Sequence, residues 1–378
     1  TKKVDKFDVF GDRGDIMKKK IAVTILLVAI LTTSIFAFAG CQKADYTIGI
    51  MENSEHMSSD EVMRGFRETM TELMRGAGKK VSYVYRKSGG DDAEKIAESE
   101  EKNAAEMSKK KVNAILAISQ SSKDAAVKVA SEIPTVFAHS AISDRNLQEE
   151  DLKVQVQRQI DLMTMLVANS ENKTLGILYC TTDELGEDGS VVKVSENKTK
   201  AEINQDLQVK IAEQYIKELG YEVAIYRYNK NEEKTHDTFV KDGLNELKND
   251  HNVGCVFVPV DNTLGLFANG PKIHQRANTN IYTSANGIEK REVANMPIVC
   301  GDIRMNSYFG VATYACDNYA LGAQAAKEVF EILVNGKQTT YSEFKTDFSK
   351  GKYVVNEQVA KDIGFEIPQS VKDLAQAA

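Results

Sequence analysis

Short apolar runs alternate with longer amphipathic segments along the chain from residue 46 onward. Residues 46–51 and 81–85 are rich in β-branched and aromatic side chains, whereas 59–75 carries apolar side chains at helical spacing. This alternation is typical of a parallel sheet with helical crossovers, so an α/β fold is predicted. The further elements of this first set are a helix over 91–109, a strand over 112–118, a helix over 121–133 and a strand over 134–138.

A second set of the same kind begins near residue 152. The economical interpretation is two Rossmann-like lobes in tandem, each a parallel sheet flanked by helices. A polar stretch over 183–200 interrupts the second set and is predicted to be a surface insertion. The elements of this set are helices over 156–168, 202–219 and 235–248 and strands over 174–179, 222–228 and 253–260.

The N-terminal segment has the pattern of an export signal. Three lysines follow Met17, then an apolar run over 21–38 and the triplet Ala39-Gly40-Cys41. This triplet resembles the lipobox of bacterial lipoproteins, in which the cysteine receives a diacylglycerol, although Phe38 stands where Leu is usual. We therefore predict a signal peptide over 17–40, lipidation of Cys41, and an extracytoplasmic chain anchored to the cell membrane through that lipid.

The N-terminal segment also has an alternative interpretation, and it is preceded by a leader of 16 residues. The apolar run approaches the length of a membrane span, so an uncleaved anchor is the alternative to cleavage. Threonine and serine residues dilute the run, and no basic stop-transfer cluster follows it, which favours the signal peptide. Residues 1–16 fit no signal architecture and are interpreted as a non-native leader outside the fold.

Charge and cysteine content narrow the function classes. Without residues 1–40 the chain keeps 41 Lys and Arg against 51 Asp and Glu, a formal charge of −10, which disfavours a nucleic acid partner. Four cysteines remain besides Cys41, and three of them lie in or beside apolar strand-like runs, where buried free thiols are expected. No Cys-x-x-Cys or Cys/His spacing predicts a metal site, and no cofactor is expected. The four are Cys180, Cys255, Cys300 and Cys316.

Catalytic spacings are absent from the sequence. It contains no phosphate-binding loop, no His-Glu-x-x-His and no Gly-x-Ser-x-Gly. The segment Gly76-Ala-Gly78-Lys79-Lys80 is better explained as the end of a helix followed by a charged turn. His56 and His139 each follow a predicted strand at the edge where α/β proteins bind ligands, but a lone histidine in a loop is more often a surface residue.

Polar residues gather at the strand-to-helix turns. A helix N-terminus presents unpaired N–H groups and a partial positive charge, which suits an anionic group of a ligand. Each such turn alone is explained as an ordinary helix cap. Together they predict one small polar ligand held between the lobes. The candidates are Gln120, Ser121, Ser122, His139, Glu202, Asn204, Asp261, Asn262, Thr263 and Asp302.

Several segments occurring in order carry a family resemblance. They are Tyr46-Thr-Ile-Gly-Ile50, Phe257-Val-Pro-Val-Asp-Asn-Thr263, Pro297-Ile-Val-Cys-Gly-Asp302, Ala312 to Gly322, Val354-Val-Asn356 and Gly364-Phe-Glu-Ile-Pro368. In these segments, which span roughly 46–371, the chain resembles the substrate-binding lipoproteins of ABC importers of the tryptophan/tyrosine type. No single segment is specific to this family, but their occurrence in this order is.

This resemblance implies a type I periplasmic-binding fold with a multi-crossing hinge. It places the N-lobe at 44–140 and 311–337 and the C-lobe at 141–310 and 338–378. It also implies a non-enzymatic, monomeric receptor that captures a small ligand and presents it to an ABC permease and its ATPase. The implied ligand is an amino acid, with an aromatic one as the narrower candidate. A ligand-sensing receptor domain for a membrane signalling partner is the alternative, and a hydrolase is a third, weaker one.

The chain departs from the family pattern at ligand-facing turns. Gln120-Ser121 replaces the usual Thr-Pro, and the segment 139–144 replaces an Asp-Pro-Val loop. The family's Glu-Ala-Asn becomes Glu202-Ile203-Asn204, displaced by the insertion. The ligand's carboxylate is expected at 120–122 and helix N–H groups, and its ammonium at Asp261 or Asp302. These departures keep the ligand's identity open.

Overall fold

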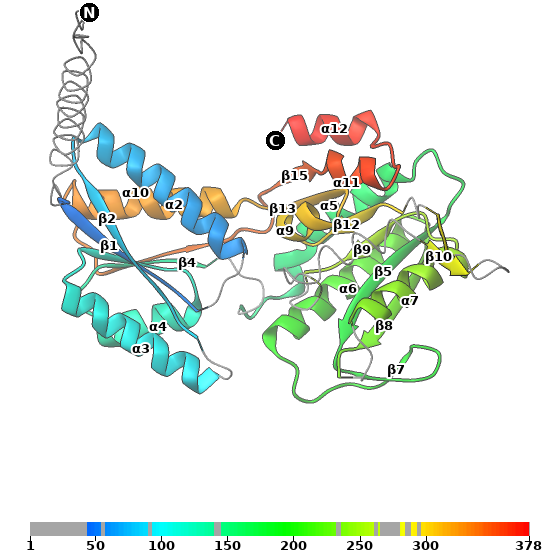
Figure 1. The fold of residues 1–378 in the computed structure, drawn as a ribbon, viewed down its shortest axis with the longest axis horizontal. Coiled ribbons are helices and arrows are strands. Elements are labelled where there is room, and N and C mark those ends of the chain that lie inside the picture. Colours follow the sequence, from blue (N-terminus) through cyan, green and yellow to red (C-terminus); the bar gives the residue numbers. More distant parts are fainter. Residues whose placement is uncertain are drawn as a thin grey trace, which may run out of the picture.

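The computed structural model shows two α/β lobes side by side (Figure 1). It describes residues 44–53, 57–89, 93–139, 145–231, 236–260, 264, 280–283, 289–292 and 296–377. The predicted leader, signal peptide and lipidated Cys41 lie outside the described residues. Within the described residues, no helix is long and apolar enough to cross a membrane.

The N-lobe is built on a five-stranded parallel sheet in the order β14-β4-β3-β1-β2. Helices α2 and α10 cover one face, and α3 and α4 cover the other. The strands are β1 (Tyr46–Glu52), β2 (Val81–Lys87), β3 (Ala114–Ala117), β4 (Thr135–His139) and β14 (Tyr341–Lys345); the helices are α2 (Met57–Gly76), α3 (Ala93–Lys110), α4 (Gln120–Val129) and α10 (Asn318–Leu333).

Alternation along the strands explains why both faces of this sheet are covered. Ile48 and Ile50 of β1 are buried under α2 and α10, whereas Met51 packs with α3 and α4. Successive side chains of a strand point to opposite faces, so a strand that is apolar at every position needs helices on both sides. The α/β prediction is confirmed for this lobe.

The C-lobe has a six-stranded sheet in the order β15-β13-β12-β9-β5-β8. Five strands are parallel, but β15 runs antiparallel to β13, which differs from the expected wholly parallel sheet. The strands are β5 (Thr174–Thr181), β8 (Glu222–Asn229), β9 (Val256–Val258), β12 (Ile298–Cys300), β13 (Ala312–Cys316) and β15 (Gly351–Val355); the helices are α5 (Glu149–Leu166), α6 (Lys200–Glu218), α7 (His236–Asn249), α9 (Ile303–Tyr308), α11 (Glu357–Asp362) and α12 (Gln369–Gln376). Two hairpins complete it, β6 (Glu184–Leu185) with β7 (Val191–Lys193) and β10 (Asn280–Thr283) with β11 (Glu289–Glu292).

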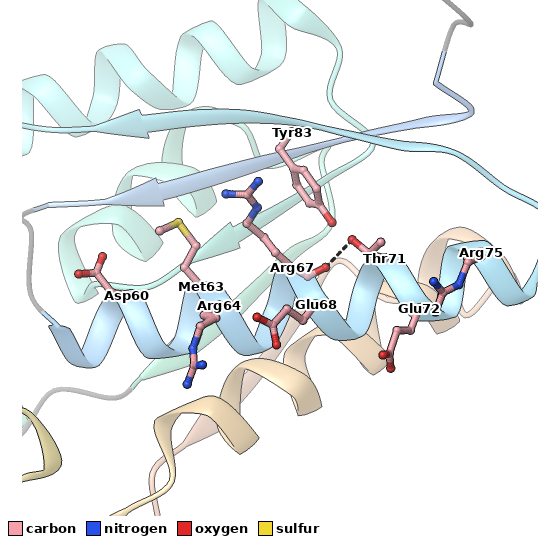
Figure 2. Close-up of a pocket in the computed structure, with 9 residues that line it drawn as sticks. All are labelled: Asp60, Met63, Arg64, Arg67, Glu68, Thr71, Glu72, Arg75 and Tyr83. Carbon is pink, nitrogen blue, oxygen red and sulfur yellow. Dashed lines mark hydrogen bonds between the residues drawn. The ribbon is translucent and has the colours of Figure 1, made fainter. Parts of the chain in front are cut away.

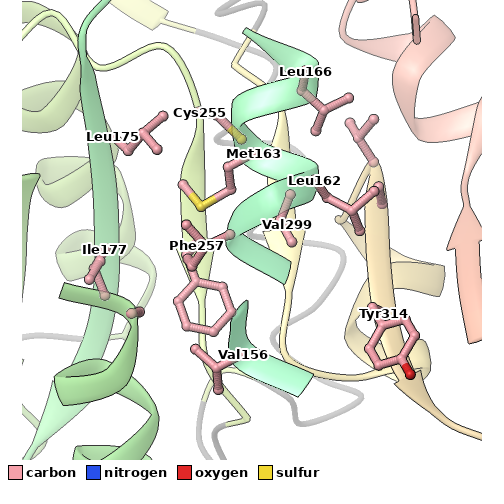
Figure 3. Packing of buried hydrophobic residues seen from close by; sticks show 14 of the residues in the cluster. Val156, Leu162, Met163, Leu166, Leu175, Ile177, Cys255, Phe257, Val299 and Tyr314 are labelled. Carbon is pink, nitrogen blue, oxygen red and sulfur yellow. The ribbon is translucent and has the colours of Figure 1, made fainter. Parts of the chain in front are cut away.

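The larger apolar cluster of the C-lobe lies between its sheet and α5. Figure 3 shows Phe257 and Val299 from the strands facing Met163 of α5. Their neighbours Val258 and Cys300 belong to the cluster on the opposite face, with α7 and α9. Helix α5 begins seven residues before the predicted start, because its first turn is acidic and only a capping box between Gln148 and Asp151 marks it.

The lobe boundaries differ from those expected. Strand β13 pairs with β12 in the C-lobe, and β14 pairs with β4 in the N-lobe. The chain therefore passes between the two sheets after β4, at Asp317 between β13 and α10, and at 346–350 between β14 and β15. The expected crossings at 311 and 338 are wrong because strand pairing, not the local apolar pattern, decides to which sheet each strand belongs.

Helices α2 and α10 approach closely at two glycines. A Cβ atom on Gly322 would lie 1.9 Å from the carbonyl oxygen of Val62, and one on Gly65 would lie 2.1 Å from that of Tyr319. Neither contact is possible for a larger residue without moving a backbone. These glycines let the helix that returns from the C-lobe pack against the first helix of the N-lobe.

Candidate functional site

The carboxyl ends of the parallel strands are where open α/β sheets bind ligands. In the N-lobe, the turn after β3 leads into α4, whose N-cap is Ser119. In the C-lobe, Glu202 and Asn204 lie in the first turns of α6, and Asp302 follows β12. The segment 261–263, with Asp261, Asn262 and Thr263, lies outside the described residues. His139 is the last residue of β4, and its side chain also lies outside them.

The three residues predicted at the N-lobe turn, Gln120, Ser121 and Ser122, differ in their exposure. Ser122 is buried: its N–H donates to Ser119 Oγ at 3.2 Å and its hydroxyl donates to Glu100 Oε1 at 2.8 Å. Gln120 and Ser121 are partly exposed, and Gln120 Nε2 donates to the Asp124 carboxylate at 3.1 Å. Only Gln120 and Ser121 therefore present accessible polar groups at this turn.

Glu100 on α3 is a buried residue that sequence reasoning missed. It is 0% exposed, and its Oε1 also accepts a hydrogen bond of 2.6 Å from Ser88 Oγ. Its Oε2 has no hydrogen-bond partner among the described residues. Burial raises the pKa of Glu100, and the two serine hydroxyls partly oppose that rise. An acidic side chain on the otherwise apolar face of 93–110 was the available signal.

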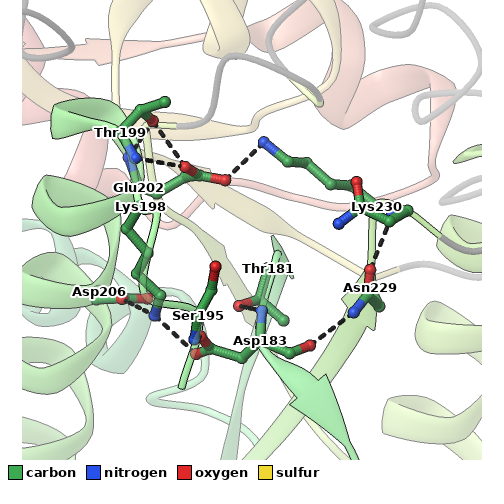
Figure 4. A network of polar contacts seen from close by, with 10 residues as sticks. Thr181, Asp183, Ser195, Lys198, Thr199, Glu202, Asp206, Asn229 and Lys230 are labelled. Carbon is green, nitrogen blue, oxygen red and sulfur yellow. Dashed lines mark hydrogen bonds and ion pairs between the residues drawn. The ribbon is translucent and has the colours of Figure 1, made fainter. Parts of the chain in front are cut away.

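The insertion places an ammonium group at the carboxyl end of the C-lobe sheet (Figure 4). Lys198 Nζ lies 2.7 Å from Asp183 Oδ2 and also contacts Asp206 Oδ2. The side chains of Lys198 and Asp183 are 11% and 6% exposed. Burial lowers the pKa of Lys198, but the two carboxylates raise it more, so the group stays charged. The insertion is exposed in its β6–β7 hairpin, as predicted, but Lys198 anchors its end inside the lobe.

Glu202 joins the same polar region through a second cation. It forms a capping box with Thr199, and its Oε1 lies 2.6 Å from Lys230 Nζ. Burial would raise the pKa of Glu202, but Lys230 and the Thr199 hydrogen bonds outweigh burial and lower it to about 2. Figure 4 shows Lys230 beside Asn229 at the end of β8. Glu202 is thus an ionised carboxylate held in place from two sides.

Asn204 and Asp302 each have a partner within the chain. Asn204 Nδ2 donates to the carbonyl oxygen of Arg145 at 2.8 Å. Asp302 Oδ1 accepts from Met305 N at 2.7 Å and is the N-cap of α9. The preceding carbonyl, that of Gly301, accepts from the buried Gln155 and Gln159 side chains of α5. This part of the site is fixed by hydrogen bonds before any ligand enters.

The crossings between the lobes contact one another. Arg145 Nη1 donates to the Thr346 carbonyl at 2.9 Å, and its guanidinium lies 4.8 Å from the Phe348 ring centroid. Cys316 Sγ lies 3.6 Å from the Asp347 carbonyl oxygen. Each contact joins the crossing over 346–350 to another crossing. In their described residues the three crossings are therefore held together between the lobes, as a hinge of several segments requires.

The four cysteines of the described part are free and buried, which confirms the prediction made for Cys180, Cys255 and Cys300 and adds Cys316. Burial raises the pKa of Cys316 to about 12 and raises those of Cys255 and Cys300 further. Within the described residues, no group of three His, Cys, Asp or Glu side chains could hold a metal ion.

Comparison with known proteins supports the fold. No protein-family model matches the chain, and no curated protein matches it. A Streptococcus pneumonia ABC domain in complex with L-Trp is similar in structure, with a TM-score of 0.52 and 20% identity over 88% of this chain and 99% of that one. The chain has the type I periplasmic-binding fold. A ligand-free, open substrate-binding protein with adhesive properties from Clostridium difficile has a TM-score of 0.54 and 19% identity over 85% and 96%. A conserved domain protein from Vibrio cholerae has a TM-score of 0.51 and 16% identity over 87% and 98%.

Proposed function

We propose that this chain is an extracytoplasmic solute-binding lipoprotein of an ABC importer and not an enzyme. The observation that carries the proposal is that three crossings are held together between two lobes whose parallel strands end in polar turns. A ligand held by both lobes favours the closed arrangement of such a hinge and so couples binding to a change of shape. The structurally similar substrate-binding proteins support this function.

We propose an amino acid as the ligand, with an aromatic side chain as the narrower candidate. Gln120, Ser121 and the N–H groups at the start of α4 suit a carboxylate. Asp302 or Asp261 would accept the ammonium group. The L-Trp complex of one structurally similar protein supports the aromatic side chain. Ser122 no longer belongs to this set, because it is buried and bonded to Glu100.

In the C-lobe, the polar side chains of Glu202 and Asn204 already have partners within the chain. Glu202 is paired with Lys230, and Asn204 is bonded to the Arg145 backbone. A ligand that reaches them therefore meets a charge pattern that is already compensated. Asn204 also contacts the hinge, because the Arg145 residue whose carbonyl it bonds is the one that contacts the crossing over 346–350.

A ligand screen tests the function. Thermal unfolding with individual amino acids, nucleosides and sugars identifies the ligand, because binding to the folded state raises the unfolding temperature. With that ligand, solution scattering should show a smaller radius of gyration. A proven ligand that leaves the scattering unchanged would contradict the hinge. A sensor without transport is the second candidate; it predicts that deleting the chain leaves uptake of the ligand intact.

Asp302→Asn tests the assignment of the ammonium group. Asn caps a helix about as well as Asp, so the Met305 hydrogen bond is kept and stability should change little. If Asp302 also receives the ammonium, affinity should fall by about 2 to 4 kcal/mol. Calorimetric titration measures this loss. A loss below about threefold would move the assignment to Asp261.

Lipidation is tested by mass spectrometry of the membrane fraction. The mature N-terminus should be Cys41 carrying acyl chains. Recovery of a chain that still begins at Met17 would contradict this part of the proposal and favour the uncleaved anchor.

A further inference from the structure

A shallow groove of about 700 Å³ lies at the end of the N-lobe where the described chain begins. Ala44, the first described residue, lines it together with Arg75, Lys79 and Lys80 from the end of α2 and the turn that follows. Thr71 and Ser82 add hydroxyl groups to its wall, and no Asp or Glu lines it. The three cationic side chains are exposed, and within the described residues none of them forms an ion pair. We call this hollow the basic groove.

The positive character is confined to this end of α2. Figure 2 shows the adjoining hollow along the same helix, where Asp60, Glu68 and Glu72 stand among the arginines. Arg75 closes the row at the far end and lines both hollows. Asp45, which directly follows Ala44, does not line the groove. Its Oδ2 accepts a hydrogen bond of 2.8 Å from the backbone N–H of Lys80.

The position of the groove relative to Cys41 suggests what occupies it. Two residues lie between Cys41 and Ala44, and an extended chain spans at most about 3.6 Å per residue, so Ala44 in the wall of the groove lies within roughly 11 Å of a lipidated cysteine. A cation that close to an anionic membrane is attracted to lipid headgroups. The overall charge of the chain is negative, so this local positive patch is not a by-product of a basic protein.

We propose that the basic groove binds the headgroups of anionic lipids, so that the N-lobe rests on the membrane at this end. The lysine and arginine side chains donate hydrogen bonds to phosphate oxygens. The Thr71 hydroxyl does not, because it already donates to the Arg67 carbonyl oxygen at 2.7 Å. Each cation strengthens membrane association by about fivefold, and three together by about a hundredfold. The lipid anchor supplies attachment, and the groove supplies orientation. This inference rests on the proposed lipidation for its geometry.

Chemical labelling of lysines on the anchored protein tests the proposal. The mature protein is placed in nanodiscs of phosphatidylcholine alone or of phosphatidylcholine mixed with phosphatidylglycerol, and acetylation is followed by mass spectrometry. Lys79 and Lys80 should react about fivefold more slowly in the anionic discs, and the exposed lysines Lys102 and Lys193 should not change. Equal labelling of Lys79 and Lys80 in both discs would overturn the proposal. So would equal protection by inorganic phosphate in neutral discs, which would indicate a site for free anions.

A matched pair of variants separates the groove from general charge. Both sheets and all four apolar clusters lie within 44–377, so a chain that starts at residue 42 retains the described fold. This chain should float with phosphatidylglycerol vesicles, and Arg75→Gln/Lys79→Gln/Lys80→Gln should lose that binding by about a hundredfold. The control, Lys102→Gln/Lys193→Gln/Lys361→Gln, removes the same charge from exposed positions away from this end of the N-lobe and should retain most of the binding. Equal losses in both would overturn the groove as the site.

These outcomes are independent of the lipoprotein assignment. If Cys41 carries no lipid but the soluble chain still binds anionic vesicles through the groove, the lipid anchor is wrong and the groove stands. If Cys41 is acylated but Lys79 and Lys80 label equally in both kinds of disc, the lipid anchor is confirmed and headgroup binding by the basic groove is wrong.

Discussion

Lys352 Nζ lies 2.9 Å from Asp317 Oδ2, and this ion pair joins two crossings of the hinge. Asp317 is the residue at which the chain leaves the C-lobe for α10, and Lys352 lies in β15, directly after the last crossing. Asp317 also caps α10 by accepting from Ala320 N at 3.0 Å. One carboxylate therefore fixes both the start of a helix and the spacing of the crossings.

Replacing Lys352 should weaken the hinge pair in a pH-dependent way. Burial raises the pKa of Asp317, but Lys352 and the backbone lower it more, so it lies below its usual 3.8. A depressed pKa gives stability that is present above 3.8 and is lost as pH falls through the folded value. Lys352→Met should therefore cost under about 1 kcal/mol at pH 7, since the pair is about a third exposed, and nothing at strongly acid pH. Urea unfolding at both pH values measures this.

The control for this change is Lys350→Met, which removes the highly exposed partner of Asp347. It should leave stability unchanged at either pH. A loss for Lys352→Met that is the same at neutral and acid pH would show that packing, not charge, is responsible.

Glu100→Gln should remove a stability cost that grows with pH. Burial raises the folded pKa of Glu100 above its usual 4.5, so ionisation opposes folding as pH rises between the unfolded and the folded values. The neutral amide can still accept from Ser88 and Ser122. We expect the variant to gain about 1 kcal/mol relative to the wild type between pH 4 and pH 8. Urea unfolding across this range, with the exposed Glu98→Gln as control, tests it; parallel curves for wild type and variant would contradict it.

Lys198→Met should leave the Asp183 and Asp206 carboxylates together without a cation. Removing one partner of a buried ion pair costs about 3 kcal/mol or more. The variant should recover stability as pH falls, because one of the two carboxylates then takes up a proton. Without the cation, repulsion between the carboxylates should raise the pKa of one of them in the folded variant, so the cost is full above that folded pKa and is lost as pH falls towards the unfolded value. Thermal unfolding at neutral and mildly acid pH measures both effects. Lys193→Met, at an exposed position of the same insertion, should have no effect, and an equally small change in Lys198→Met would refute the role of Lys198 as anchor.

Gly322→Ala should force α2 and α10 apart. The added Cβ would meet the Val62 carbonyl oxygen at 1.9 Å, a contact with backbone that no rotamer change relieves. We expect a loss of about 3 kcal/mol in the free energy of unfolding. Gly76→Ala at the end of α2 has open space around its Cβ and serves as the control. If both variants are equally stable, the helices can adjust and the close approach is not required.

The candidate site was only partly predictable from sequence. The turns before α4, in α6 and after β12 were identified because a strand followed by small polar residues is a local signal. Their partners were not: Ser122 bonds to Glu100 from another helix, and Glu202 pairs with Lys230 from the end of β8. These contacts join residues that are 22 and 28 positions apart, and the local sequence around one residue does not predict its partner.

The sequence by itself determined the α/β class, three of the four buried thiols and most strands and helices, because a strand or helix that is buried on one face repeats its apolar residues every two or 3.6 positions. Only the tertiary structure decided that β13 belongs to the C-lobe and β14 to the N-lobe, and that β15 runs antiparallel. It also decided that Gly65 and Gly322 face each other's helices. The physical reason is that strand order and helix contact depend on hydrogen bonds and packing between segments far apart in the chain, which no local pattern encodes.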